Sequence, residues 1–153
     1  MTTLQPNIRF AIKEDLDELV TLCEEHAQYE KAEYCSLNKR QLLEDSIFNA
    51  MPSLFCLVVE VDKKCIGYAT YMKQFSTWDA AYYIYMDCLF LKEGWRGFGL
   101  GEKLIEQIKT EGKRLECSLI QWQTPDFNIR SIKFYNRIGA TSKTKERFFL
   151  TIK

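Results

Sequence analysis

The residues best suited to chemistry form a glycine-rich segment at positions 96–101 (RGFGLG), between an apolar stretch and a helical pattern. Three glycines in five residues let the backbone bend and approach a ligand closely. The N–H groups and dipole of a following helix would favour a di-anion such as a pyrophosphate, with Arg96 adding positive charge. The segment lacks the sixth-position glycine of a dinucleotide fingerprint and the Gly-Lys-Ser/Thr of a Walker loop. The plain alternative is a turn that only joins a strand to a helix.

A single carboxylate interrupts the apolar run just before this segment. Asp87 is the only acid between Ala80 and Leu91. A carboxylate in a buried strand is costly unless it is paired or solvated, so its presence predicts a polar cavity beside it. Asp87 is therefore our candidate proton acceptor. The alternative is a strand-end acid paired with a surface lysine.

Three further side chains are weaker candidates. Tyr135 lies on a helical stripe with two isoleucines, so it is either a proton donor or part of the core. His26 shares the apolar stripe of its predicted helix, which favours a satisfied, partly buried histidine. Cys88 adjoins Asp87, but strict strand alternation would place the two side chains on opposite faces, which argues against a cysteine relay.

Alternating periodicities predict the elements that position these residues. We expect strands at 8–12, 54–61, 65–72, 80–91, 117–123 and 148–152. We expect helices from 14 to about 31, from Ser36 to about Met51, after the glycine-rich segment to about 115, and from Asn128 through Ile138, closed by Gly139. This order describes an α/β fold, a mixed sheet with helices on both faces.

Length and composition limit the function classes. A chain of 153 residues predicts one domain, 1–153. Its 21 basic and 21 acidic residues cancel, which disfavours nucleic acid as a partner. It has no apolar run of the ~18–20 residues that span a membrane. We find no secretory signal at the N-terminus, so we expect a cytoplasmic protein. One histidine and six cysteines without C-x-x-C spacing indicate reduced thiols and no metal.

The pattern Arg96-x-x-Gly99-x-Gly101 resembles the acyl-CoA pyrophosphate loop of the GNAT superfamily of N-acetyltransferases. Other stretches resemble the spermidine/spermine (diamine) N-acetyltransferase family and its thialysine-acetylating relatives. These stretches are 29–30 (YE), 55–60 (FCLVVE), 76–78 (STW), 85–87 (YMD), 95–101 (WRGFGLG) and 134–140 (FYNRIGA). The resemblance implies a mostly antiparallel sheet of six to seven strands, acetyl-CoA as co-substrate without a metal, and a homodimer.

The resemblance also implies roles for individual residues. The cofactor would be held by Arg96, Gly97, Phe98, Gly99, Leu100, Gly101 and Glu102, by the backbone of Leu89, Phe90 and Leu91, and by Asn128, Ser131 and Tyr135. The amine would lie near Tyr29, Glu30, Asp87, Gln121, Trp122 and Gln123. Asp87 would accept the amine proton, directly or through a water, and Tyr135 would protonate the departing thiolate. A solvated helix end is the alternative for Tyr29 and Glu30.

Two departures from the polyamine enzymes bear on the acceptor. Cys88 stands where those enzymes tend to carry a second acid, and the segment 142–146 (SKTKE) brings two lysines where an acidic contact is expected. We therefore predict direct transfer of an acetyl group, in a ternary complex, to the primary amine of a diamine, a polyamine or a lysine-like amino acid. The two departures favour a short diamine or an amino acid over spermidine. The alternatives are acetylation of a protein N-terminus or lysine, and a CoA-binding module without turnover.

Overall fold

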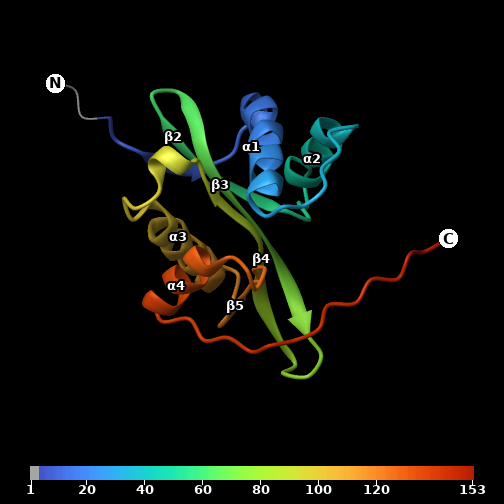
Figure 1. Cartoon of the computed structure of the whole chain (residues 1–153). Coiled ribbons are helices and arrows are strands. Elements are labelled where there is room, and N and C mark those ends of the chain that lie inside the picture. The colour runs from blue at the N-terminus through green and yellow to red at the C-terminus, as the bar shows by residue number, and fades with distance from the viewer. Residues whose placement is uncertain (1–3) are drawn as a thin grey trace. The chain divides into compact units, whose positions relative to one another are not determined.

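A five-stranded sheet in the order β1-β2-β3-β4-β5 forms the frame of the first part of the chain (Figure 1). The structure is a computed structural model that describes residues 4–153. Residues 1–3, part of the N-terminus in which we find no secretory signal, lie outside the described residues. The chain divides into two units, Met1–Gln123 and Thr124–Lys153, and each is described by itself.

The sheet is mixed and mostly antiparallel, as predicted, but it has fewer strands than the expected six to seven. The strands are β1 Asn7–Phe10, β2 Phe55–Val61, β3 Lys64–Ser76, β4 Ala81–Leu91 and β5 Ile120–Gln121. The first four pair antiparallel, and β5 runs parallel to β4. The predicted strand 117–123 shrinks to two residues, and 148–152 forms no strand. Alternating apolar residues favour an extended conformation, but a strand also needs a partner to pair with.

The helices of the first unit flank the sheet. They are α1 Leu16–Tyr29, α2 Lys39–Ile47 and α3 Leu100–Arg114, with short 3-10 turns at Lys13–Asp15 and Glu93–Trp95. Leu19 and Leu22 of α1 pack in one buried cluster with Val58 and Tyr68. α3 buries Leu104 and Ile108, as its periodicity predicts. The second helix begins after Asn38 rather than at Ser36, because Asn38 adopts a left-handed backbone with φ of 60°.

An ion-pair cluster fixes the start of α1 against the sheet. Arg9 donates to Asp15 Oδ2 at 2.7 Å and to Glu60 Oε2 at 2.6 Å. Burial raises the pKa of Asp15, but hydrogen bonds from Arg9 and from the Ile12 N–H outweigh burial and hold that pKa below its ordinary value. Since Arg9 lies on β1 and Glu60 on β2, the cluster ties the helix entry to two strands.

The second unit contains one helix, α4 Ile129–Arg137, followed by an extended segment. Asn128 Oδ1 accepts a hydrogen bond from the Ser131 N–H at 3.4 Å, which confirms the predicted N-cap. Gly139 follows with φ of 91°, the left-handed conformation expected of a residue that ends a helix.

Within residues 4–153, no helix is long and apolar enough to cross a membrane. The same residues contain no group of three or more His, Cys, Asp or Glu side chains placed to hold a metal ion.

Candidate active site

A β-bulge at Asp87 interrupts strand β4. Thr70 of β3 pairs with Cys88 and its neighbour Tyr71 pairs with Met86, so Asp87 is the extra residue of the pair. A bulge bends its strand and breaks the alternation of side chains between faces. Asp87 is exposed, whereas Met86 beside it is buried.

The strand exchanges its buried face at this bulge. Ile84 lies against Gly112 of α3, whereas Cys88 and Phe90 pack in the cluster that contains the α1 leucines. Regular alternation would place these even-numbered residues on one face. The expectation that Asp87 and Cys88 point to opposite faces is therefore wrong: the Cys88 Sγ lies 3.8 Å from Asp87 Oδ2.

His26 joins the end of α1 to the sheet beside the bulge. Its Nδ1 lies 2.8 Å from the Tyr68 hydroxyl and its Nε2 lies 3.2 Å from Glu30 Oε1. The imidazole stacks on Phe90 with ring centroids 5.1 Å apart and is in hydrogen-bond contact with Cys88. Burial lowers the pKa of His26, but the hydrogen bonds and charges of Cys88 and Glu30 outweigh burial and raise it to about 9. The predicted satisfied, buried histidine is confirmed, and it carries a positive charge near neutral pH.

Arg96 connects the glycine-rich segment to the same cluster. Its Nε donates to the Leu91 carbonyl at 2.8 Å, and its guanidinium carbon lies 4.2 Å from the centroid of the Tyr29 ring and 5.3 Å from that of Phe90. These contacts bring the predicted amine contact Tyr29 beside the predicted cofactor strand. They also hold Arg96 against the sheet at the entrance to the loop.

The glycine-rich segment has the backbone geometry that an anion site needs. Gly97 and Gly99 adopt φ of 85° and 78°, and a Cβ at either position would meet nothing within 4 Å. Gly99 is the N-cap of α3, so the unpaired N–H groups of the first helical turn follow it directly. An open main-chain concavity at a helix N-terminus fits a diphosphate.

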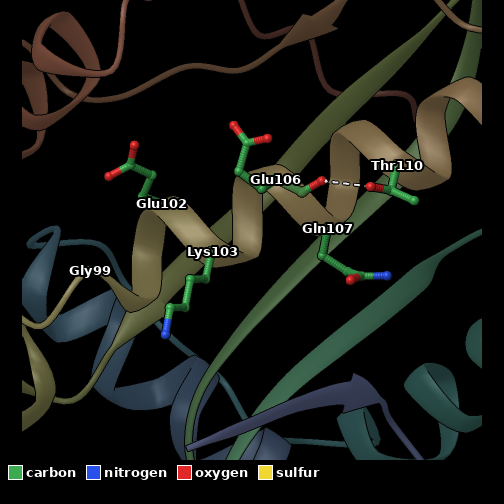
Figure 2. Close-up of a pocket in the computed structure, with 6 residues that line it drawn as sticks. All are labelled: Gly99, Glu102, Lys103, Glu106, Gln107 and Thr110. Atoms are coloured by element: carbon green, nitrogen blue, oxygen red, sulfur yellow. Dashed lines mark hydrogen bonds between the residues drawn. The ribbon is translucent and has the colours of Figure 1, made fainter.

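A shallow hollow of about 520 Å³ runs from Gly99 along the exposed side of α3 (Figure 2). Its lining residues are Gly99, Glu102, Lys103, Glu106, Gln107 and Thr110. Lys103 projects from the first turn of the helix on the side away from Glu106 (Figure 2). The hollow therefore places one cation, Lys103, and two acids, Glu102 and Glu106, beside the glycine concavity.

The remaining predicted amine contacts in the first unit lie at the end of β5. Gln121 pairs with Tyr85 of β4, and the Gln123 amide donates to the Tyr85 hydroxyl at 3.2 Å. Trp122, between them, is half-buried. Glu30 therefore contacts His26, which in turn contacts Cys88 at the bulge. The two glutamines contact Tyr85, which lies before the bulge on the same strand, β4.

The other predicted residues belong to the second unit. Asn128 and Ser131 form the α4 cap, and Tyr135 lies beside the Phe134 ring at a centroid distance of 5.3 Å. Their assignment to the cofactor and the thioester stays a prediction.

Residues 14–140 match the Acetyltransferase (GNAT) family, and the chain belongs to this family. The protein is an acyl-CoA-dependent N-acetyltransferase. The match spans both units and includes the bulge, the glycine-rich segment and α4.

The chain is also similar to individual acetyltransferases. Thialysine N-epsilon-acetyltransferase from Bos taurus is 29% identical over 147 residues, covering 90% of this chain and 85% of its own. D-amino-acid N-acetyltransferase HPA3 from Saccharomyces cerevisiae is 30% identical over 74 residues, which cover 48% of this chain and 46% of its own. The solved structure of aminoglycoside N-acetyltransferase AAC(6')-Iy in complex with CoA has a TM-score of 0.82 at 16% identity, covering 97% of this chain and 96% of that chain. This last likeness shows the fold.

Sequence reasoning gave little weight to three residues of this region. His26 carried no signal beyond an apolar stripe, and Cys88 was set aside by an alternation that the bulge breaks. Lys103 was not singled out. Its position one turn into the helix after three glycines is the signal that could have identified it.

Proposed function

We propose that this protein transfers an acetyl group from acetyl-CoA to the primary amine of a small molecule. The observation that carries the proposal is an exposed carboxylate, Asp87, beside Cys88 and hence beside the His26 cluster, at a bulge on the strand that leads to the left-handed glycines. An acid near an anion-binding loop suits attack by an amine on a thioester. The names of the relatives agree, since they describe acetylation of thialysine, D-amino acids and L-ornithine.

The glycine concavity is the proposed diphosphate site. The backbone N–H groups from Gly97 to Glu102 would hold the coenzyme, with Lys103 as a nearby cation. The β4 backbone from Leu89 to Leu91 would pair with the pantetheine arm as an added strand would. Bound acetyl-CoA supplies the thioester carbonyl that the amine attacks.

Asp87 is the proposed proton acceptor. An alkyl ammonium with a pKa of ~10.4 is protonated near neutral pH, and deprotonating it costs roughly 4–5 kcal/mol. Asp87 accepts that proton directly or through a water. Tyr135, in the second unit, is the proposed donor to the leaving thiolate.

The charge of the cluster favours a small acceptor. Of the two acids assigned to the amine, Glu30 is already paired with His26, whose pKa of about 9 keeps the imidazole cationic near neutral pH. A long polycation would therefore meet less negative charge than the count of acids implies. A short diamine or a lysine-like amino acid fits this arrangement better than spermidine.

We further propose that both units make one catalytic domain, 1–153, in a cytoplasmic homodimer. The family match across both units supports the single domain. The exposed side chains of Phe148, Phe149, Leu150 and Ile152 support a second copy as a partner, because apolar patches of this kind often mark an interface.

The test is a pair of measurements on the purified chain. Calorimetric titration with CoA should show binding, and free thiol should be released from acetyl-CoA when small primary amines are present. The amine panel includes a short diamine, lysine analogues, spermidine and a peptide with a free N-terminus. The highest kcat/KM for spermidine would contradict the small-acceptor proposal, and the highest value for the peptide would favour a protein acetyltransferase. CoA binding without thiol release for any acceptor would reduce the chain to a binding module.

A further inference from the structure

The cluster beside the bulge contains a cysteine that contacts a histidine, and the same histidine contacts a carboxylate. Cys88 is in hydrogen-bond contact with His26, and His26 Nε2 lies 3.2 Å from Glu30 Oε1. A sulfur nucleophile, a base and an acid that orients the base form the usual arrangement of an activated thiol. Cys88 and His26 have no part in the amine transfer proposed above, in which Asp87 and Tyr135 move the protons.

The other cysteines of the cluster lack such an environment. Burial raises the pKa of the Cys65 thiol to about 12, and it also raises the pKa values of Cys23 and Cys56. Cys35 is exposed on the loop before α2, so it is the reference for a thiol that reagents reach freely. Cys88 is half-buried, so reagents can reach it, and the His26 imidazole lies in hydrogen-bond contact with it.

A second, independent feature points to a ligand at this sulfur. Thr70 is the cross-strand partner of Cys88, it is 4% exposed, and its Oγ1 has no hydrogen-bond partner among the described residues. Tyr68 lies two residues before Thr70 on β3 and packs with Cys88 in the cluster on the α1 side of the sheet. Residues two apart on a strand point to the same side, so Thr70 shares this face with Cys88. Cross-strand neighbours on one face bring their Cβ atoms to about 4.5–5.5 Å. A buried hydroxyl in need of an acceptor suits the oxygen of an acyl group attached to that sulfur.

We propose that Cys88 is a second acyl acceptor of this protein: an activated thiol that takes the acyl group of a thioester and becomes S-acylated. Its reaction with acetyl-CoA rests on the proposed function, whereas its reaction with a small thioester does not.

The step balances without another reactant. The reacting form is the ion pair in which the Cys88 proton already lies on His26, and from this form the Cys88 sulfur makes a bond to the thioester carbonyl carbon. The bond from that carbon to the original sulfur breaks, its electron pair goes to the leaving sulfur, and that sulfur receives the proton from His26. One thiol and one thioester give one thiol and one thioester, with the Thr70 hydroxyl donating to the carbonyl oxygen.

The first experiment measures the nucleophilicity of the thiol in the full chain. Limiting iodoacetamide at neutral pH, followed by peptide mass spectrometry, should label Cys88 at least about 5-fold faster than Cys35. His26→Gln and Glu30→Gln should lower the rate at Cys88 and leave Cys35 unchanged, while Glu24→Gln, an exposed acid on the same helix, should change neither. Glu30→Gln keeps the buried histidine, so it tests the contacts of Cys88, His26 and Glu30 even if His26→Gln fails to fold. Faster labelling of Cys35 in the wild type would overturn the proposal.

The second experiment tests acylation itself. The chain is incubated without amine with acetyl-CoA or with the acetyl thioester of N-acetylcysteamine, which lacks the phosphates. Hydroxylamine-sensitive acetyl on Cys88, absent in Cys88→Ser, is the expected result. If CoA does not bind and the small thioester still acetylates Cys88, this inference holds and the proposed function fails. If amines release thiol normally and neither thioester acetylates Cys88, the proposed function holds and this inference fails.

Discussion

At the scale of single residues, the site is governed by how each polar group is paired. His26 is 9% exposed, yet it carries charge near neutral pH because Cys88 and Glu30 lie against it. Asp87 is exposed and lies beside Cys88, which leaves its carboxylate open to an incoming amine. Similar residue types thus take different tasks according to their neighbours.

The contacts of His26 should raise the free energy of unfolding, and this contribution should decrease in mild alkali. Its pKa rises from 6.5 to about 9 on folding, so the contribution is fully present below pH 6.5 and is lost as the pH rises through about 9. At ~1.4 kcal/mol per pKa unit, the loss should be about 1–3 kcal/mol. Urea unfolding from pH 6 to 9.5 should show this slope in the wild type and a flatter one in His26→Gln. Glu24→Gln should keep the wild-type slope, and equal slopes in all three proteins would contradict the assignment.

Replacing Asp87 should impair proton removal from the amine. Asp87→Asn should lower kcat/KM by about 10²–10⁴-fold near neutral pH, the usual contribution of general acid–base catalysis. Activity should recover in part as the pH approaches ~10, because the free amine then loses its proton in solution. Asp79→Asn, in the β3–β4 turn, is the control. A pH–rate profile identical to that of the wild type would remove Asp87 as the acceptor.

Tyr135 should matter for turnover more than for binding. Tyr135→Phe should lower kcat because the phenol proton is lost, while the Kd for acetyl-CoA should stay close to the wild-type value. Steady-state kinetics and calorimetry on the same preparation check the two quantities. Tyr82→Phe, on the β3–β4 hairpin, should change neither. An unchanged kcat in Tyr135→Phe would exclude a catalytic role.

At the scale of elements, two backbone irregularities create the site. The bulge at Asp87 turns the second half of β4 toward α1, and the two left-handed glycines open a concavity at the start of α3. A regular strand would place Cys88 on the face opposite Asp87, and a side chain at the two glycines would enter the open space beside the loop. The function therefore depends on backbone shape as much as on side chains.

The glycine concavity should not tolerate a side chain at its centre. Gly99→Ala places a Cβ in a left-handed position, at a cost of about 1–2 kcal/mol, and fills the space offered to the diphosphate. We expect KM for acetyl-CoA to rise by at least about 10-fold, which corresponds to ~1.4 kcal/mol. Gly94→Ala, where a Cβ also meets nothing within 4 Å but φ is not left-handed, is the matched control. Equal KM values in the two variants would contradict the diphosphate site.

At the scale of the whole molecule, the C-terminal segment is the feature that most needs a partner. Its four large apolar side chains at 148, 149, 150 and 152 are between 81% and 97% exposed. Burying apolar surface contributes roughly 25 cal/mol per Å². A second copy of the chain would provide that burial.

Removing residues 148–153 should convert the proposed dimer into a monomer. Light scattering coupled to size exclusion should report twice the chain mass for the full protein and a single chain mass after truncation. Met51→Ser, which removes another exposed apolar side chain, should leave the mass unchanged. A monomeric full-length protein would contradict the homodimer.

The amino-acid sequence by itself determined the helices, the first four strands and the family. Local periodicity was sufficient for α1, α3 and the Asn128 cap, because helical spacing and capping depend on near neighbours. The glycine-rich segment predicted a main-chain anion site from its spacing, and its resemblance to the GNAT pyrophosphate loop supplied the acyl-CoA chemistry.

Only the tertiary structure decided the strand partners, the bulge and the cluster around His26. β5 has two residues and the C-terminal segment forms no strand, because a strand forms only where it can pair with the edge of another strand. The local composition of a segment does not show which edge it will pair with. The contacts of His26 with Tyr68 and Cys88 join residues 42 and 62 positions apart, so their charge and orientation arise from folding. Long-range contacts set these properties, and no short window of sequence contains them.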